Sequence, residues 1–180
     1  MNYWHQLPRE GCLLWCQHAF MTSRVDYCKS ILAGALKTTT DRLQRILNAA
    51  ARVVSDTKKF DQGLLRLMHQ ELYWLDIPER VKYKLGMLTH WCLLSKAPVY
   101  LSDRCIPVAQ IATGWHLCSA AHHQLTVPRH RLSMFGRRAF AVAGPTMFNA
   151  LLDNVWNPAV STTTFGQSMK THLFSAYQHV

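Results

Sequence analysis

Apolar residues recur at helical spacing through the first half of the chain, most clearly in residues 40–54. Thr40 is expected to cap this helix, and Asp41 is expected to lie in its first turn, near the positive end of the helix dipole. The predicted apolar face consists of Leu43, Ile46, Leu47, Ala50, Val53 and Val54. Because such a stripe is stable only when it is buried, the pattern predicts a packed helical domain.

Three more helices are predicted by the same periodicity. Residues 12–36 and 61–73 each carry apolar residues on one face. The last of these helices begins near residue 76, where Asp76 and Glu79 have the spacing of a capping box and a proline lies in the first turn. Its stripe continues toward Pro98, which is expected to end it because proline cannot continue a helix.

These elements predict a mainly α fold. Four amphipathic helices with short connections predict a bundle of about four helices in residues 12–105, after an irregular N-terminus at residues 1–11. Residues 106–124 show no sustained period and predict a long loop. Residues 125–180 are expected to hold a basic, irregular or edge-strand segment followed by a C-terminal helix.

The C-terminal part has three local signals. Residues 125–131 alternate weakly, and Pro128 would confine such a strand to an edge. The pair Gly144-Pro145 is expected to break whatever precedes residues 147–152. Ser161 opens a cluster of capping residues. The apolar stripe of the last predicted helix consists of Phe165, Met169, Leu173 and Ala176.

The charge balance favours a polyanionic partner. The 180-residue chain has a formal net charge of +10 and a pI near 9.6, with 49% hydrophobic and 17% charged residues. This composition is that of a folded protein rather than of a disordered one. Beyond Asp103 the chain carries six Arg or Lys against a single carboxylate, Asp153. The C-terminal part is therefore almost purely cationic.

Most of this charge lies in one short stretch, residues 125–138, here called the basic segment. Its candidate contacts with nucleic acid are Arg129, His130, Arg131, Arg137 and Arg138, together with Phe135 as a ring on which an unpaired base could stack. A solvated cationic surface without a specific partner is the alternative interpretation.

Further blocks of sequence lie outside the basic segment. They are Arg24-Val-Asp-Tyr-Cys-Lys-Ser, Leu43-Gln-Arg-Ile-Leu-Asn-Ala-Ala-Ala-Arg, Leu72-Tyr-Trp-Leu-Asp-Ile-Pro-Glu-Arg, Ala97-Pro-Val-Tyr-Leu-Ser-Asp and Met169-Lys-Thr-His-Leu-Phe. Together with residues 125–149, these blocks resemble, in the same order, a segment of the reverse transcriptases of LINE-type non-LTR retrotransposons. The similarity is to the chicken-repeat and jockey-like group, and it covers roughly residues 18–177.

The resemblance implies the thumb and the region beyond it, a part of the polymerase that is thought to hold template RNA and primed target DNA. The parent family is an RNA-directed DNA polymerase, whose two metal ions need closely placed carboxylates. The sequence contains no Asp-Asp pair. We therefore expect a non-enzymatic remnant with residual, non-specific RNA or DNA binding and no cofactor. The alternative is a small helical protein-interaction module without a nucleic-acid role.

Metal binding is a third hypothesis, which rests on His116, Cys118, His122 and His123. Imidazole and thiolate ligands suit zinc, but their spacing matches no familiar zinc motif, so a solvated histidine-rich loop is the simpler interpretation. The six cysteines form no Cys-x-x-Cys pair. We expect an intracellular protein, cytoplasmic or nuclear, with neither a secretory signal nor a membrane span and with no membrane partner.

Overall fold

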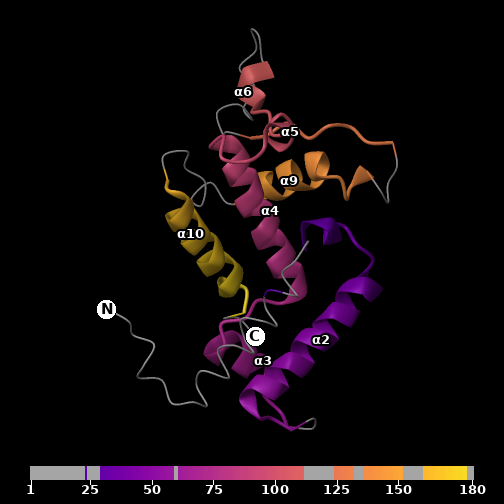
Figure 1. Cartoon of the computed structure of the whole chain (residues 1–180), viewed down its shortest axis with the longest axis vertical. Helices are drawn as coiled ribbons and strands as arrows, with labels where there is room; N and C mark the ends of the chain where they lie inside the picture. Colours follow the sequence, from indigo (N-terminus) through magenta and orange to yellow (C-terminus); the bar gives the residue numbers. More distant parts are fainter. Residues whose placement is uncertain are drawn as a thin grey trace. The chain divides into compact units, whose positions relative to one another are not determined.

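The computed structural model describes residue 23 and residues 29–58, 61–111, 124–131, 136–151 and 160–177 (Figure 1). Over this part the protein is mainly α-helical, which confirms the predicted fold class. The chain divides into two compact units, one formed by residues 1–28 and 37–74 and the other by residues 29–36 and 75–180.

The first unit contains a long helix and a short helical segment. Helix α2 (Lys37–Ser55) buries Leu47, Ala50 and Ala51, so the centre of the predicted apolar face is confirmed. Two members of that face, Ile46 and Val53, are instead 50% and 69% exposed. The buried surface of α2 is thus narrower than the sequence pattern, because only the residues closest to the middle of the stripe reach the core.

The start of α2 differs from the prediction. The helix begins at Lys37, so Thr40 lies inside it and its hydroxyl donates to the Lys37 carbonyl at 2.8 Å. Asp41 consequently lies beyond the first turn, which contains no acidic residue. A threonine inside a helix can bond to a backbone carbonyl one turn earlier, which removes the need for it to act as a cap.

The predicted helix at residues 61–73 is shorter than expected. Helix α3 (Leu64–Arg66) follows Gly63, whose φ of +93° favours glycine, and continues as the π-helical turn η3 (Leu67–Glu71). Met68 is buried, and its carbonyl accepts a hydrogen bond from the Trp74 backbone at 2.8 Å. The Trp74 side chain is also buried, and α3 packs against α2 within this unit.

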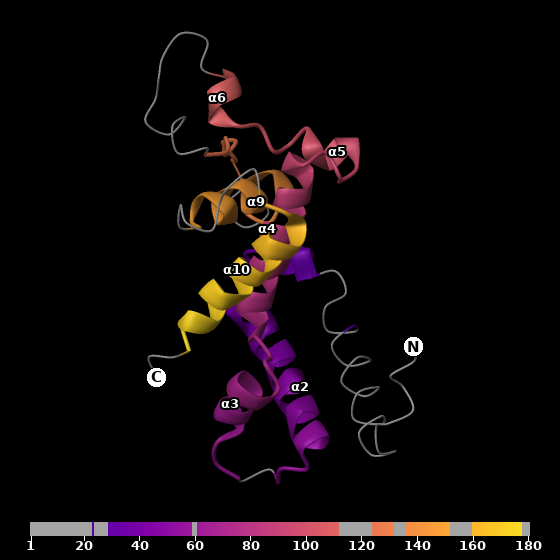
Figure 2. The same ribbon diagram turned by 90° about the vertical axis from the view of Figure 1, so that its left-hand side faces the viewer.

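The second unit is built around helix α4 (Ile77–Leu93), which packs against η2 (Lys29–Leu32), α9 (Phe140–Asn149), α10 (Thr162–Ser175) and α5 (Val99–Ser102) (Figure 2). One side of α4 meets α9 through Val81, Leu85 and Ala143. Another side meets α10, where His90 stacks on Phe165 with ring centroids 4.2 Å apart.

The second compact unit combines helices that lie far apart in the sequence. Helices α2 and α3 belong to one unit, whereas α4 belongs with α9 and α10 from the C-terminal part. The reason is that α4 has apolar surface on two sides, and the C-terminal helices supply partners for both. Helices α2 and α3 thus lie in a different compact unit from α4.

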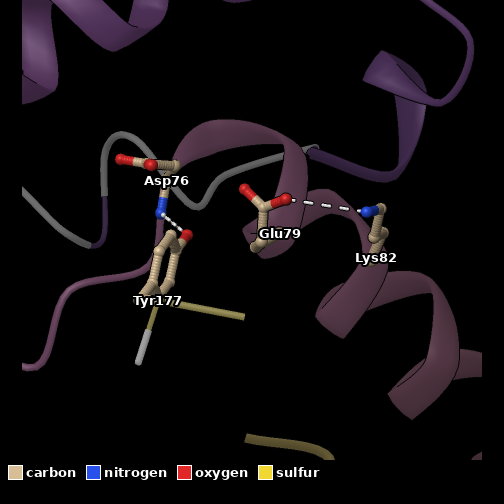
Figure 3. Close-up of polar contacts among 4 residues, drawn as sticks. All are labelled: Asp76, Glu79, Lys82 and Tyr177. Atoms are coloured by element: carbon tan, nitrogen blue, oxygen red, sulfur yellow. Dashed lines mark hydrogen bonds and ion pairs between the residues drawn. The ribbon is translucent and has the colours of Figure 1, made fainter. Parts of the chain in front are cut away.

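The beginning of α4 carries the predicted N-cap residue but not the predicted capping box. Asp76 is the N-cap and a proline lies in the first turn, yet the Asp76 side chain makes no capping hydrogen bond. Instead, the Asp76 backbone N–H donates to the Tyr177 hydroxyl at 3.2 Å (Figure 3). Glu79 lies 3.6 Å from Lys82. Burial raises the pKa of Tyr177, in keeping with a structural hydroxyl.

The end of α4 comes before Pro98. The helix ends at Leu93, and Ser95 takes a left-handed conformation with φ of +55°. The Lys96 backbone N–H then donates to the Trp91 carbonyl at 2.9 Å. A left-handed residue followed by such a bond closes the last turn of a helix, so the prediction that Pro98 ends this helix is wrong.

Helix α9 runs through Gly144-Pro145, so the predicted break there is also wrong. Pro145 cannot donate a backbone hydrogen bond, a loss that usually costs a helix about 3 kcal/mol. Both residues are buried, and a Cβ on Gly144 would lie 2.9 Å from the Thr89 hydroxyl of α4. The absence of that Cβ permits close approach of the two helices, and the resulting burial compensates for the missing hydrogen bond.

The C-terminal helix agrees with its sequence signals. The Ser161 side chain accepts a hydrogen bond from the Thr164 backbone at 3.2 Å, as an N-cap does. Phe165, Met169 and Leu173 are buried, as predicted, whereas Ala176 lies past the helix end and is exposed. In the part of the chain that the structure describes, no helix is both long enough and apolar enough to cross a membrane.

Candidate nucleic-acid interface

The basic segment starts from a buried residue. Leu125 is 2% exposed and forms an isolated antiparallel bridge with Pro107. The Thr126 N–H donates to the Ile106 carbonyl at 2.9 Å, and the Val108 N–H donates to the Gln124 carbonyl at 2.8 Å. The predicted edge strand over residues 125–131 is thus reduced to one bridge. The predicted loop at 106–124 contains the short helix α6 (Val108–Ile111).

The other edge of Leu125 is occupied by a side chain. The Leu125 N–H donates to Oδ1 of Asn149 at 2.8 Å, and Nδ2 of Asn149 donates to the Leu125 carbonyl at 2.8 Å. Asn149 is the last residue of α9. Its amide satisfies both backbone groups that Leu125 presents on that side, so the start of the basic segment is fixed on both edges.

From Leu125 the chain continues as an extended stretch without helix (Figure 1). Arg129, His130 and Arg131 are all exposed there, and Arg137 is exposed after the gap in the described residues. None of the three arginines forms an ion pair with another residue of the described ranges. Three guanidinium groups and an imidazole are therefore available to solvent or to an anionic partner.

A close contact brings the two halves of the basic segment together. A Cβ on Gly136 would lie 2.6 Å from Cβ of His130, so only a glycine fits beside this histidine. The contact places residues 129–131 next to residues 136–138. The five predicted basic residues therefore form one cluster in space as well as in sequence. Phe135, the predicted stacking ring, lies outside the described residues.

Arg138 differs from the other four basic residues. It is half-buried, and its guanidinium Nη2 donates to the Ile31 carbonyl at 3.3 Å. Its aliphatic chain packs near Gly34, where a Cβ would lie 3.5 Å from Cγ of Arg138. Gly34 has φ of +61°, a left-handed conformation that favours glycine. Arg138 thus anchors the far end of the segment to the turn after η2, while further N–H donors remain on its guanidinium.

Metal binding and cysteine chemistry are the other candidate activities that the sequence raises. The candidate metal ligands His116, Cys118, His122 and His123 lie outside the described residues. Within those that are described, no group of three His, Cys, Asp or Glu side chains could hold a metal ion. Cys92 and Cys105 are buried free thiols in the apolar core. Burial raises the pKa of the Cys105 thiol to about 12, so it is protonated and unreactive at neutral pH.

Sequence reasoning found the cations but missed the residues that hold them. Asn149, Gly136 and the Ile31 carbonyl carry no motif that marks them as partners of the basic segment. Asn149 lies 24 positions from Leu125 in the sequence, and a backbone carbonyl has no sequence signature. These contacts arise from the tertiary arrangement alone.

The fold and this surface define a helical protein that presents a fixed cationic cluster. Comparisons with protein-family models, with curated proteins and with solved structures give no match to the chain.

Proposed function

We propose that this protein binds RNA or DNA without sequence preference, through the phosphates, at the cluster formed by the basic segment. The observation that supports the proposal most is the contact of His130 with Gly136, which gathers four exposed basic residues and Arg138 into one place. A polyanion with regularly spaced charges fits such a cluster better than a single small anion does.

The resemblance to LINE-type reverse transcriptases supports the same proposal. In that family the corresponding region is thought to hold the template and the primed target. We propose that the chain derives from the thumb and post-thumb region and keeps a binding role. Arginines that contact phosphates fix the position of a nucleic acid but do not read its sequence, which is why we propose non-specific binding.

The proposed role is binding and not polymerisation. Phosphoryl transfer by a polymerase needs two metal ions held by neighbouring carboxylates, and the sequence has no Asp-Asp pair. The purified protein should therefore extend no primer on any template with Mg²⁺ or Mn²⁺. Template-dependent nucleotide incorporation above a control without protein would contradict this expectation.

The binding proposal is tested by a triple substitution of Arg129, Arg131 and Arg137 by Gln. Affinity for a labelled oligo(dT) strand and for a labelled duplex, measured by fluorescence anisotropy at several salt concentrations, should fall for both. Each phosphate contact that is lost should reduce the slope of log affinity against log salt by ~0.7–0.9. All three side chains are solvent-exposed, so the thermal melt should change little.

The matched control replaces Arg42, Arg45 and Lys58 by Gln, because these are also exposed cations and the change in net charge is the same. If the control weakens binding as much as the triple variant, overall charge and not the cluster is responsible. If neither variant changes the affinity or the slope, the basic segment is only a solvated surface.

A protein-interaction module is the second candidate, and exposed apolar side chains on the second unit favour it. Val99 and Tyr100 of α5 are 75% and 70% exposed, and Ile111 of α6 is 53% exposed. Binding to a protein through these residues would depend weakly on salt, whereas phosphate contacts weaken steeply as salt rises. The same salt series therefore separates the two functions.

A further inference from the structure

The two described parts of the basic segment, residues 125–131 and 136–138, are both connected to α9. Residues 136–138 are followed by Ala139, the N-cap of α9, and Leu125 is hydrogen-bonded to Asn149, the last residue of α9. A helix of this length spans about 15 Å, at 1.5 Å per residue. Residues 125–131 and 136–138 are thus connected to opposite ends of the same helix.

The near attachment has the hydrogen-bond pattern of a strand between two neighbours. Gln124 and Thr126 pair through their backbones with Val108 and Ile106 on one edge. On the opposite edge the N–H and the carbonyl of Leu125 pair with the Asn149 amide, at 2.8 Å each. The Asn149 amide therefore takes the place of a neighbouring strand, because it offers both a donor and an acceptor at neutral pH.

We propose that Asn149 is the positioning residue of the nucleic-acid interface: by clamping the Leu125 backbone to the end of α9, it sets the direction and spacing of Arg129, His130 and Arg131 relative to Arg137. The inference rests on the binding function proposed above. Asn149 touches no ligand itself. It reduces the number of conformations that the segment must give up on binding, which is how preorganisation raises affinity.

Loss of the two hydrogen bonds between Asn149 and Leu125 should lower the affinity for nucleic acid, although no charged residue is removed. In Asn149→Ala the near end of the segment is released on one edge, so the arginines at 129 and 131 no longer stay in register with the one at 137. We expect roughly tenfold weaker binding to oligo(dT) and a salt slope smaller by ~0.7–0.9, the value of one phosphate contact. The Leu125 amide should also exchange its hydrogen faster, because its acceptor is gone.

A second variant distinguishes the loss of the Asn149–Leu125 hydrogen bonds from general destabilisation of the fold. Asn149→Asp keeps an acceptor for the Leu125 N–H but places a carboxylate oxygen against the Leu125 carbonyl, so at neutral pH it should bind as weakly as Asn149→Ala. When pH falls toward about 4, the ordinary pKa of aspartic acid, the protonated carboxyl regains a donor. The ratio of its affinity to that of the wild type at the same pH should then return toward one. Asn149→Ala should show no such recovery.

The control is Asn48→Ala on α2, which removes a comparable amide that accepts from Gln44 at 3.0 Å. It should leave affinity and slope unchanged. If the wild type binds with a steep salt slope but all Asn149 variants match it, Asn149 does not position the interface, and the proposed binding function stands. If the wild type itself shows no salt-dependent binding, the proposed function has failed. In that case Leu125 exchange in the Asn149 variants still reports whether the clamp exists.

Discussion

Leu85→Asp should unfold the second compact unit. Leu85 is 4% exposed and lies in a cluster with Ala33, Val81 and Ala143, at the contact between α4 and α9. A carboxylate at this place would be buried without a partner, which costs several kcal/mol unless the structure opens. That penalty is comparable to the whole stability of a domain of this size, about 5–15 kcal/mol. Circular dichroism should therefore show loss of helix signal and of the cooperative melt.

Lys84→Asp is the matched control, because residue 84 is the exposed neighbour on the same helix. It should melt within a few degrees of the wild type, since exposed substitutions usually change stability by less than about 0.5 kcal/mol. In the first unit Leu47→Asp should be equally damaging, since Leu47 is fully buried. A Leu85→Asp variant that melts like the wild type would mean that this face of α4 is not buried.

His90→Phe should stabilise the protein and remove part of its acid sensitivity. The His90 ring is 3% exposed and stacks on Phe165 with an interplanar angle of 7°. Its buried Nε2 has no hydrogen-bond partner among the residues that the structure describes. A buried polar atom left unpaired costs about 1–3 kcal/mol. Phenylalanine keeps an aromatic pair without that atom, so the free energy of unfolding should rise by an amount in that range.

The pH dependence follows from the lowered pKa of His90. Burial disfavours the imidazolium, and the charge of Lys96 lowers the pKa further. In the unfolded chain the histidine has its ordinary pKa, near 6.5, so below that pH the unfolded state binds a proton that the folded state resists. The contribution is fully present above pH 6.5 and is lost as pH falls toward the lowered, folded-state pKa.

Urea unfolding at several pH values measures this effect. The chain has ten histidines, so the quantity to compare is the difference in stability between wild type and His90→Phe. This difference should grow as pH falls below 6.5. Lys96→Gln should reduce the acid sensitivity slightly, because it removes the smaller of the two causes. Parallel curves for wild type and His90→Phe would show that His90 is not held neutral in the folded state.

Two helices could be largely predicted from the sequence, because the apolar stripes that their sequences predict are the ones buried in the structure. In α10 the Ser161 cap and the stripe of Phe165, Met169 and Leu173 agree with the structure. In α2 the central residues Leu47 and Ala50 are buried as expected. Periodicity is sufficient in these cases, because a helix with one apolar face has one way to bury it.

Predictions of helix ends, breaks and caps from short-range sequence signals were wrong where contacts between distant residues favoured another conformation. Gly144-Pro145 predicts a break, yet α9 continues through it because contact with Thr89 and the rest of α4 requires the missing Cβ. Pro98 predicts the end of α4, but Ser95 ends it earlier by a left-handed turn. The Asp76 and Glu79 spacing predicts a capping box, but the Tyr177 hydroxyl, distant in sequence, takes the Asp76 N–H.

By itself, the sequence determined that the chain is mainly helical and strongly basic, and which arginines carry the charge of its C-terminal part. These properties follow from residue type and short-range spacing, which the order of amino acids specifies directly. Only the tertiary structure decided that α4 packs with α9 and α10, that His130 meets Gly136, and that Asn149 holds Leu125. Such contacts join residues that are distant in the sequence or that fit together sterically. They stabilise the protein only after the surrounding helices have packed.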